Sequence, residues 1–259
     1  MSNGSLDKWI YHVDQEHILD WKCRKKIILD IAKGLAYLHE DCRQKVIHLD
    51  IKPQNILLDN DFNAKISDFG LSKLLDRNQT QVMTTMRGTP GYLAPEWLSS
   101  VITEKVDVYS FGIVLLEILC GRKNFDRSLP EESWHLLRVF QNCWEQGTLL
   151  NIVDMTSEDL QKNGTEVMEM MKIASWCLQT DYTRRPSMSS VVKVIEGAMN
   201  IESNLDYNFT DPRLQKNNSQ EELTSLFPSV LSGPRFLACA DSKGKENMVD
   251  DKLRNEDTT

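Results

Sequence analysis

The sequence has no hydrophobic run long enough to cross a membrane, no paired cysteines and no excess of basic residues. Its longest apolar run, residues 113–120, is interrupted by Glu117 and is far shorter than the roughly 20 residues of a membrane helix. No Cys-x-x-Cys pair occurs among the six cysteines, which argues against a zinc site or a disulfide framework. A net charge of −8 argues against nucleic acid or an anionic membrane as the main partner.

The start of the chain also lacks the features of a signal peptide, because polar residues follow Met1. Hydrophobic residues make up 41% of the sequence and charged residues 26%, which is typical of a soluble globular protein with a sizeable core. A length of 259 residues is enough for one large domain or two small ones. We therefore expect this chain to be soluble.

Helical periodicity dominates residues 1–200. Asp20 is expected to cap a long helix that runs to about Leu38. His39, near the end of this helix, is expected to be a structural residue or a partner of the helix C-terminus, and not a ligand. The apolar positions of this helix are Trp21, Ile28, Ile31, Leu35 and Leu38. The basic side chains expected to face water are Lys22, Arg24, Lys25 and Lys26.

A second helix, predicted over residues 105–120 and ended by Gly121, is apolar on nearly every side. Such a helix must be buried, so we expect it to form the centre of the domain. Amphipathic helices are predicted over residues 134–145 and 166–178, and a last one follows Pro186, with Ser187 as its cap, to about residue 199. Residues 201–259 are polar and are expected to form a disordered tail, so the domain is assigned to residues 1–200.

Two polar clusters interrupt short β-prone runs between residues 45 and 70. The first cluster, His-Leu-Asp-Ile-Lys-Pro-Gln-Asn at residues 48–55, lies between the runs 46–47 and 56–58. The second, Asp-Phe-Gly at residues 68–70, follows the run 64–66. Strands separated by polar turns predict hairpins, which would hold the two clusters side by side. Residues 71–89 between these clusters and the next motif are polar, as expected of a mobile surface segment.

This combination of side chains is suited to phosphoryl transfer. Asp50 can accept the proton of an attacking hydroxyl group, and Lys52 can neutralise charge on the transferred phosphate. Asn55 and Asp68 can hold Mg²⁺, with Phe69 packed beneath the aspartate. The simpler interpretation, ordinary turn residues of a hairpin, does not explain the order and spacing of the whole set. That set comprises His48, Asp50, Lys52, Asn55, Asp68, Phe69, Gly70, Ala94, Pro95 and Glu96.

The set resembles the catalytic loop, the Asp-Phe-Gly motif and the Ala-Pro-Glu motif of protein kinases. The resemblance implies ATP and Mg²⁺ as cofactors and a protein as substrate. It also implies that Asp107 binds the backbone of the catalytic loop, that Arg185 pairs with Glu96 and that Leu57 lies beneath adenine. The implied fold is mainly α (α+β): the C-terminal lobe of a kinase, a helical bundle around a buried central helix, with short β-hairpins carrying the catalytic loops and the N-lobe sheet absent.

Lys52 after the catalytic aspartate, together with Thr89, is the serine/threonine version of the kinase pattern. Leu49 stands where most kinases have an arginine, which resembles the non-RD kinases. Since leucine cannot grip a phosphate, phosphorylation of the neighbouring segment would lack its usual clamp. The candidate phosphorylation sites in that segment are Thr80, Thr84 and Thr85.

The wider sequence resembles plant receptor-like kinases, and most of all the S-domain, G-type-lectin kinases. The resemblance to receptor-like kinases lies in the Trp97-Leu98 pair, the run 101–112, the Cys-Leu-Gln at 177–179 and the Arg-Pro-Ser-Met at 185–188. The resemblance to the S-domain kinases lies in His-Leu-Asp-Ile-Lys-Pro-Gln-Asn at 48–55. The resemblance covers about residues 1–197. It implies a membrane-anchored parent with the kinase on the cytoplasmic side of the plasma membrane, and it leaves the oligomeric state open.

No Gly-x-Gly-x-x-Gly and no Val-Ala-Ile-Lys occurs in the sequence, although complete kinases use both to bind nucleotide phosphates. We expect the chain to begin where the smaller lobe ends, as an incomplete gene model or a truncated product, and to be weakly active or inactive alone. Three interpretations follow: the larger lobe of a serine/threonine kinase, a kinase-lobe interaction module without catalysis, or an unrelated helical scaffold. The motif set nearly excludes the third.

Overall fold

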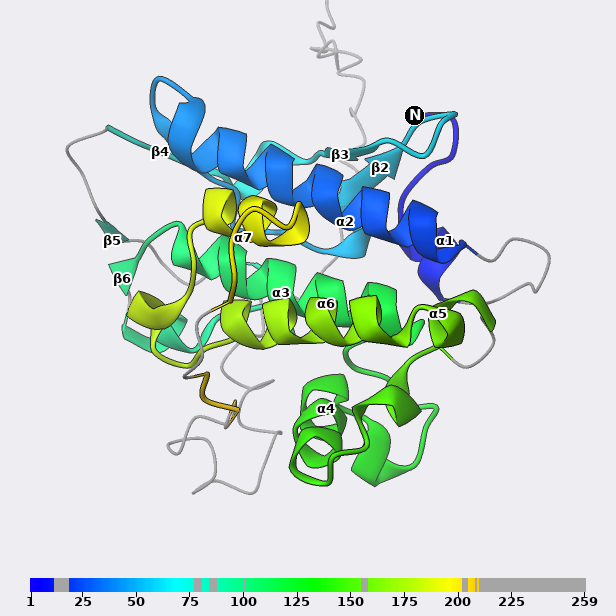
Figure 1. Cartoon of the computed structure of the whole chain (residues 1–259). Coiled ribbons are helices and arrows are strands. Elements are labelled where there is room, and N and C mark those ends of the chain that lie inside the picture. The colour runs from blue at the N-terminus through cyan, green and yellow to red at the C-terminus, as the bar shows by residue number, and fades with distance from the viewer. Residues whose placement is uncertain are drawn as a thin grey trace, which may run out of the picture. The chain divides into compact units, whose positions relative to one another are not determined.

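The computed structural model describes residues 1–11, 19–76, 81–83, 88–99, 101–154, 158–201, 205–207 and 209, which fold mostly into helices (Figure 1). The α-helices are α1 (Asp7–Ile10), α2 (Trp21–Ala36), α3 (Lys105–Cys120), α4 (Leu136–Glu145), α5 (Glu158–Lys162), α6 (Gly164–Cys177) and α7 (Met188–Ile195). The strands are β1 (Lys45–Ile47), β2 (Ile56–Leu58), β3 (Ala64–Ile66), β4 (Lys73–Leu75), β5 (Val82–Met83) and β6 (Val101–Ile102).

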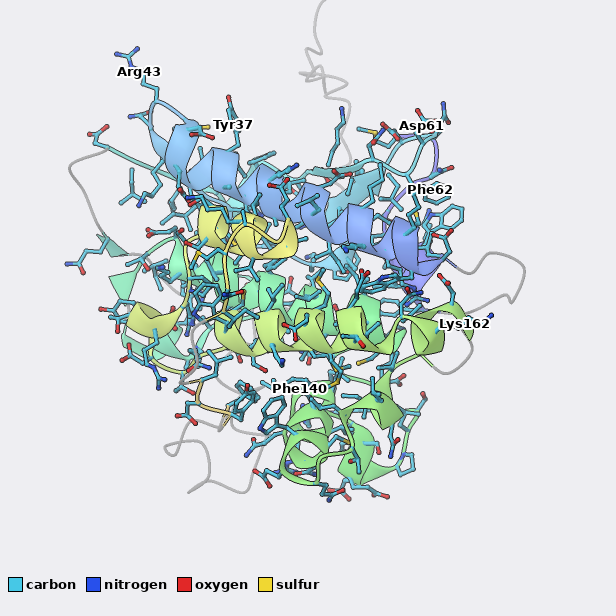
Figure 2. All side chains as sticks on the ribbon, viewed as in Figure 1. Tyr37, Arg43, Asp61, Phe62, Phe140 and Lys162 are labelled. Carbon is cyan, nitrogen blue, oxygen red and sulfur yellow. The ribbon has the colours of Figure 1, made fainter. Side chains whose placement is uncertain are left out.

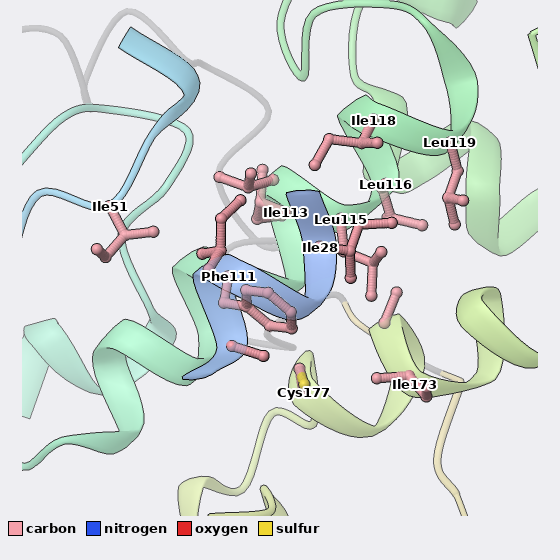
Figure 3. Packing of buried hydrophobic residues seen from close by; sticks show 14 of the residues in the cluster. Ile28, Ile51, Phe111, Ile113, Leu115, Leu116, Ile118, Leu119, Ile173 and Cys177 are labelled. Carbon is pink, nitrogen blue, oxygen red and sulfur yellow. The ribbon is translucent and has the colours of Figure 1, made fainter. Parts of the chain in front are cut away.

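Helix α3 lies at the centre of the fold, and every residue from position 106 to 120 is buried. It packs against α6 and α2, as Figure 3 shows for Phe111 and Leu115 of α3 beside Ile28 of α2 and Ile173 of α6. Gly121 ends the helix in the left-handed region, with φ 65°. The prediction of a buried central helix is confirmed, and its bounds agree with those predicted.

Helix α2 begins as predicted, because the Asp20 carboxylate accepts a hydrogen bond from the Cys23 N–H at 2.7 Å. It ends in a π-helical turn, Tyr37–Asp41. The predictions for the other helices are confirmed in position, with ends that differ by a few residues. The Ser187 hydroxyl caps α7 by accepting from the Ser190 N–H. Among the described residues, no helix combines the length and the hydrophobicity needed to span a bilayer.

Arg24 contradicts the prediction that it faces water, because its side chain is fully buried. Its guanidinium forms an ion pair with Asp154 at 2.5 Å and donates to the carbonyl oxygens of Leu19 and Ile118 at 3.0 and 2.5 Å. Arg24 lies four residues before Ile28, on the face that α2 turns to the core. The fold supplies hydrogen-bond acceptors for this buried cation. The residue type alone does not indicate that these acceptors are present, so the burial of Arg24 was not predicted.

The strands form three two-stranded antiparallel sheets within the described residues, and the predicted hairpin of β2 and β3 is confirmed. Strand β1 does not join that hairpin; it pairs with β4, a strand in the segment expected to be mobile. The chain thus passes from β1 to β2 through the first polar cluster, and from β3 to β4 through the second. Both clusters therefore connect the same two sheets, β1–β4 and β2–β3, and this places the clusters side by side.

The turn of the β2–β3 hairpin packs against α1. Figure 2 shows Phe62 on this turn, and its ring meets the Trp9 ring edge-on with centroids 4.8 Å apart. The segment before α1 runs along β2, with the Leu58 N–H donating to the Gly4 carbonyl at 2.8 Å. These contacts fix the strand that follows the first polar cluster.

Five residues of the expected tail are described (201, 205–207 and 209), and two of them pack on α4. The Tyr207 ring stacks on Trp144 at 3.5 Å, and Phe209, which is 4% exposed, lies 5.7 Å from the ring of Phe140 (labelled in Figure 2). Gln179 and the Asp206 backbone exchange hydrogen bonds of 2.7 and 3.0 Å. Ordered packing therefore continues past residue 200, while the rest of the predicted tail lies outside the described residues.

Replacing Tyr207 with leucine is expected to lower the free energy of unfolding by about 0.5–1.5 kcal/mol, because the stacked pair with Trp144 is lost. Chemical denaturation of the full chain measures this effect. Tyr37→Leu is the matched control, since Tyr37 is 58% exposed. Equal effects of the two substitutions would contradict a stabilising role for this stack.

Candidate active site

Asp107, in the first turn of α3, holds the backbone of the first polar cluster. Its carboxylate accepts from the His48 N–H at 2.7 Å and from the Leu49 N–H at 2.8 Å. His39, from the turn after α2, contacts the same carboxylate at 2.9 Å, which is the structural role expected of it. Leu49 has φ 68°, a left-handed conformation that a leucine rarely adopts. Asp107, supported by His39, therefore fixes this strained loop from two distant segments of the chain.

The Asp50 carboxylate lies on this loop and is held at both oxygens. Oδ1 accepts from the Thr89 hydroxyl at 2.6 Å, and Oδ2 accepts from the Asn55 amide and the Lys52 ammonium, each at 2.9 Å. The Lys52 ammonium also donates to the Thr89 hydroxyl at 2.8 Å. Only 8% of Asp50 is exposed. A carboxylate held in this way is oriented before any hydroxyl group approaches it.

The second polar cluster lies against the first through backbone and imidazole contacts. The Asn55 carbonyl accepts from the backbone and the hydroxyl of Ser67, each at 2.9 Å. The His48 imidazole lies 3.0 Å from the Ser67 carbonyl through Nε2. Its Nδ1 accepts from the Asp50 N–H at 3.3 Å, which assigns the proton to Nε2. The predicted side-by-side arrangement of the two clusters therefore holds.

Asp68 and Phe69 stand at the exposed end of this arrangement. Asp68 has φ 62°, is exposed, and accepts from the Gly70 N–H at 3.3 Å. The Phe69 ring meets the His48 ring edge-on, with centroids 5.0 Å apart, and is 45% exposed. Phe69 thus contacts the first polar cluster, and nearly half of its surface faces solvent.

Oxygen groups suited to Mg²⁺ are present at Asn55 and Asp68. Both hydrogens of the Asn55 amide donate to Asp50, so its side-chain oxygen is the atom left for a cation. The described residues hold no group of three or more His, Cys, Asp and Glu side chains arranged to bind a metal. Mg²⁺ is commonly held by one or two protein oxygens together with substrate phosphates. The donor set at Asn55 and Asp68 fits that pattern.

Leu49 belongs to the first polar cluster, and Leu57 lies between the two clusters, on β2. Leu57 is half-buried, between the buried Ile56 and Leu58 of β2, and so points to the other face of the strand. Leu49 is buried, with 5% of its surface exposed. The candidate phosphorylation sites Thr80, Thr84 and Thr85 lie outside the described residues.

Glu96 and Arg185 meet in a buried, two-pronged ion pair although 89 positions separate them. The guanidinium donates to the two carboxylate oxygens at 2.6 and 2.8 Å, and also to the carbonyls of Gln179 and Lys105 at 2.7 and 2.9 Å. It lies over the Tyr109 ring, 4.9 Å from the centroid. The pair links the segment after Thr89 to the loop before α7.

The hydrogen-bond network around Glu117 was not predicted from the sequence. Its only signal there is a charged residue inside an apolar helix. The carboxyl group accepts from the hydroxyls of Tyr11 and Tyr92 at 2.8 and 3.0 Å and from the Asn124 N–H at 2.7 Å. Burial raises the pKa of Glu117 to about 7. Burial also raises the pKa of both tyrosines, beside Glu117, so they remain hydrogen-bond donors.

Glu117 is expected to make stability depend on pH. Between its ordinary pKa of 4.5 and its folded pKa of about 7, the folded protein holds more protons at this site than the unfolded chain. The contribution of Glu117 is therefore full below pH 4.5 and is lost as the pH rises through 7. Glu117→Gln should gain about 2–3 kcal/mol relative to the parent protein between pH 5 and pH 8.

Urea denaturation of both proteins at several pH values measures this difference. Glu169→Gln is the matched control, because the Glu169 side chain is 54% exposed. A stability difference between Glu117→Gln and the parent that does not change with pH would contradict the prediction.

Comparisons with known proteins show the family to which the chain belongs. A model of the protein kinase domain matches residues 1–194. The chain is 52% identical over 199 residues to the G-type lectin S-receptor-like serine/threonine-protein kinase SD2-5 of Arabidopsis thaliana, covering 76% of this chain and 24% of that protein. It is 44% identical to LECRK2 of Oryza sativa subsp. japonica and 46% identical to LECRK3 of subsp. indica, proteins of the same description, over 78% of this chain and 24% of each relative.

The chain thus spans about a quarter of the length of these curated relatives. The family model covers most of the chain, including the region of both polar clusters. The chain belongs to the protein kinase family, and its relatives are plant receptor-like serine/threonine kinases.

Proposed function

We propose that this chain carries the catalytic residues of a serine/threonine protein kinase, which transfers the γ-phosphate of ATP to a protein hydroxyl group. The observation that supports this most strongly is the Asp50 carboxylate, held at 2.6–2.9 Å by Thr89, Asn55 and Lys52. A hairpin turn does not need an acid held by three partners from two segments. General-base catalysis needs a carboxylate oriented toward the proton that it accepts, and these contacts orient Asp50.

Each residue of the cluster has a distinct task in this proposal. Asp50 accepts the proton of the attacking hydroxyl, and Lys52 stabilises charge on the transferred phosphoryl group. Asn55 and Asp68 would hold Mg²⁺, which shields the phosphate charge when bound. Leu57 would lie beneath the adenine ring, with β2 as its support.

Three residues support a proposal for the substrate and the regulation. The contact of Lys52 with Thr89 supports Ser or Thr as the acceptor, and the relatives are named serine/threonine-protein kinases. Leu49 is buried and has no charge with which to bind a phosphate, which supports non-RD regulation. The relatives are receptor-like, so we place the activity in receptor-like kinase signalling at the cytoplasmic side of the plasma membrane.

A binding module without catalysis is the second candidate. It is favoured by the 45% exposure of the Phe69 ring, an apolar surface next to the site. The sequence contains no Gly-x-Gly-x-x-Gly, so residues 1–259 lack those backbone donors to nucleotide phosphates. We therefore expect weak nucleotide binding and little phosphate transfer from this polypeptide alone.

One experiment separates the two candidates. Residues 1–259 are expressed alone and as a hybrid kinase, joined to the segment that precedes the matched region in the Arabidopsis relative. Transfer of labelled γ-phosphate to a protein substrate is measured with and without Mg²⁺, and the modified residue is identified. We expect Mg²⁺-dependent phosphoserine or phosphothreonine from the hybrid. A folded hybrid that binds ATP without transferring phosphate would contradict catalysis and favour the binding module.

A further inference from the structure

The segment from Thr89 to Leu93 lies beside Asp50 and reaches solvent. Thr89 donates its hydroxyl hydrogen to the Asp50 carboxylate at 2.6 Å, and Pro90 and Gly91 next to it are exposed. A substrate hydroxyl that reaches Asp50 must bring the flanking residues of its peptide near this segment. We call residues 89–93 the substrate platform.

The platform is held from below by side chains of other segments. The Ser110 hydroxyl of α3 donates to the Tyr92 carbonyl at 2.8 Å, and the Tyr92 hydroxyl donates to Glu117 of the same helix at 3.0 Å. The Asn124 amide, from the loop after α3, donates to the Gly91 carbonyl at 2.6 Å. The Ser110 and Asn124 bonds thus fix two consecutive backbone carbonyls of the platform.

Asn124 is itself held in place at both backbone groups. Its N–H donates to Glu117 at 2.7 Å, and its carbonyl accepts from the Leu136 N–H at the start of α4 at 2.9 Å. Only 8% of Asn124 is exposed. The backbone of Asn124 is therefore fixed where its side chain reaches Gly91. Removing the side chain leaves both backbone hydrogen bonds intact.

Gly91 has the conformation that this contact requires. Its φ is 92°, a region that favours glycine, and a Cβ atom built on it would stand 3.0 Å from the Asn124 amide nitrogen. A larger residue would push the amide away from the carbonyl. The two residues thus form a matched pair across 33 positions of the sequence.

We infer that Asn124 is a positioning residue, which fixes the platform for the peptide that carries the acceptor Ser or Thr. The inference rests on the proposed kinase function. Asn124 does not touch the reacting groups, whereas Thr89 ties the platform to Asp50. Loss of the amide leaves the Gly91 carbonyl without this donor and loosens the exposed part of the platform, so peptide binding suffers while the nucleotide site does not.

Asn124→Ala in the full chain is expected to raise the hydrogen-exchange rate of residues 88–93 about tenfold, because the partly buried hydrogen bond to the Gly91 carbonyl is lost. Asn124→Asp keeps the shape and replaces the donor with an acceptor, so it should give at least the same increase. Asn163→Ala is the matched control, since its amide donates to the Asp159 carbonyl at 2.8 Å, in α5.

In the hybrid kinase, Asn124→Ala should raise the KM for a serine peptide about tenfold and leave the KM for ATP within about twofold. Asn163→Ala should change neither value. Unchanged exchange of residues 88–93, or equal changes in both KM values, would overturn the inference. The proposed function is tested separately: Asp50→Asn should lose phosphate transfer, and Asn163→Ala should keep it. Hydrogen exchange reports on the platform whether or not phosphate is transferred.

Discussion

Asp50→Asn is expected to lower the kcat of the hybrid kinase by about 10²–10⁴-fold, the usual contribution of a general base. An amide cannot accept the proton of the attacking hydroxyl group. It would also turn a neutral group toward the Lys52 ammonium, which now lies 2.9 Å from Oδ2. The overall fold should survive, because the backbone of this loop is held by Asp107 and not by the Asp50 side chain.

Steady-state phosphate transfer measures this loss, and circular dichroism shows whether the variant is folded. Asp61→Asn is the matched control, because Asp61 is exposed in the β2–β3 turn (Figure 2). A folded Asp50→Asn variant with near-parental kcat would contradict the assignment of Asp50 as the base.

The non-RD proposal adds a comparison with the same variant. Replacing Thr80, Thr84 and Thr85 together with alanine should reduce activity less than Asp50→Asn does, since Leu49 cannot bind a phosphate placed on them. Equal losses from the two changes would contradict non-RD regulation.

Arg185→Met is expected to lower the free energy of unfolding by about 3–5 kcal/mol, because it leaves the buried Glu96 carboxylate without its cation. The Arg185 side chain is 0% exposed and the Glu96 side chain 7%, so water cannot replace the lost partner. A typical domain is stable by only about 5–15 kcal/mol, so this one change should shift the denaturation midpoint strongly.

Lys172→Met is the matched control, because its partner Glu169 and Lys172 itself are 54% and 40% exposed. An exposed pair of this kind contributes about 0–1 kcal/mol. The double variant Glu96→Leu with Arg185→Met should recover part of the loss, since no buried charge is then left unpaired. An effect of Arg185→Met no larger than that of Lys172→Met would contradict the importance of the buried pair.

The comparison of sequence with structure is clearest in the helices and loops. The helix at residues 105–120 could be predicted to its ends, because its apolar composition and Gly121 are local signals. The cap at Asp20 and the β2–β3 hairpin could also be predicted from the sequence, since each depends on neighbours within a few residues. The pairing of β1 with β4 could not be predicted, because strands of three residues carry little information about a distant partner.

Buried polar residues show the opposite case. Arg24 was expected in water because charged side chains are usually exposed, and only the tertiary structure places Asp154 and two carbonyls around it. Glu117 and Asn124 gave no recognisable motif. Their roles depend on Tyr11, Tyr92 and Gly91, which come from other parts of the chain.

The sequence by itself determined the family and predicted the proposed chemistry, because Asp50, Lys52, Asn55 and Asp68 lie in two short motifs whose order and spacing indicate phosphoryl transfer. The tertiary structure alone decided how these residues are held. Asp107 reaches His48 from 59 positions away and Thr89 reaches Asp50 from 39. Such contacts depend on the packing of α3 against the rest of the core, and local periodicity does not encode that packing.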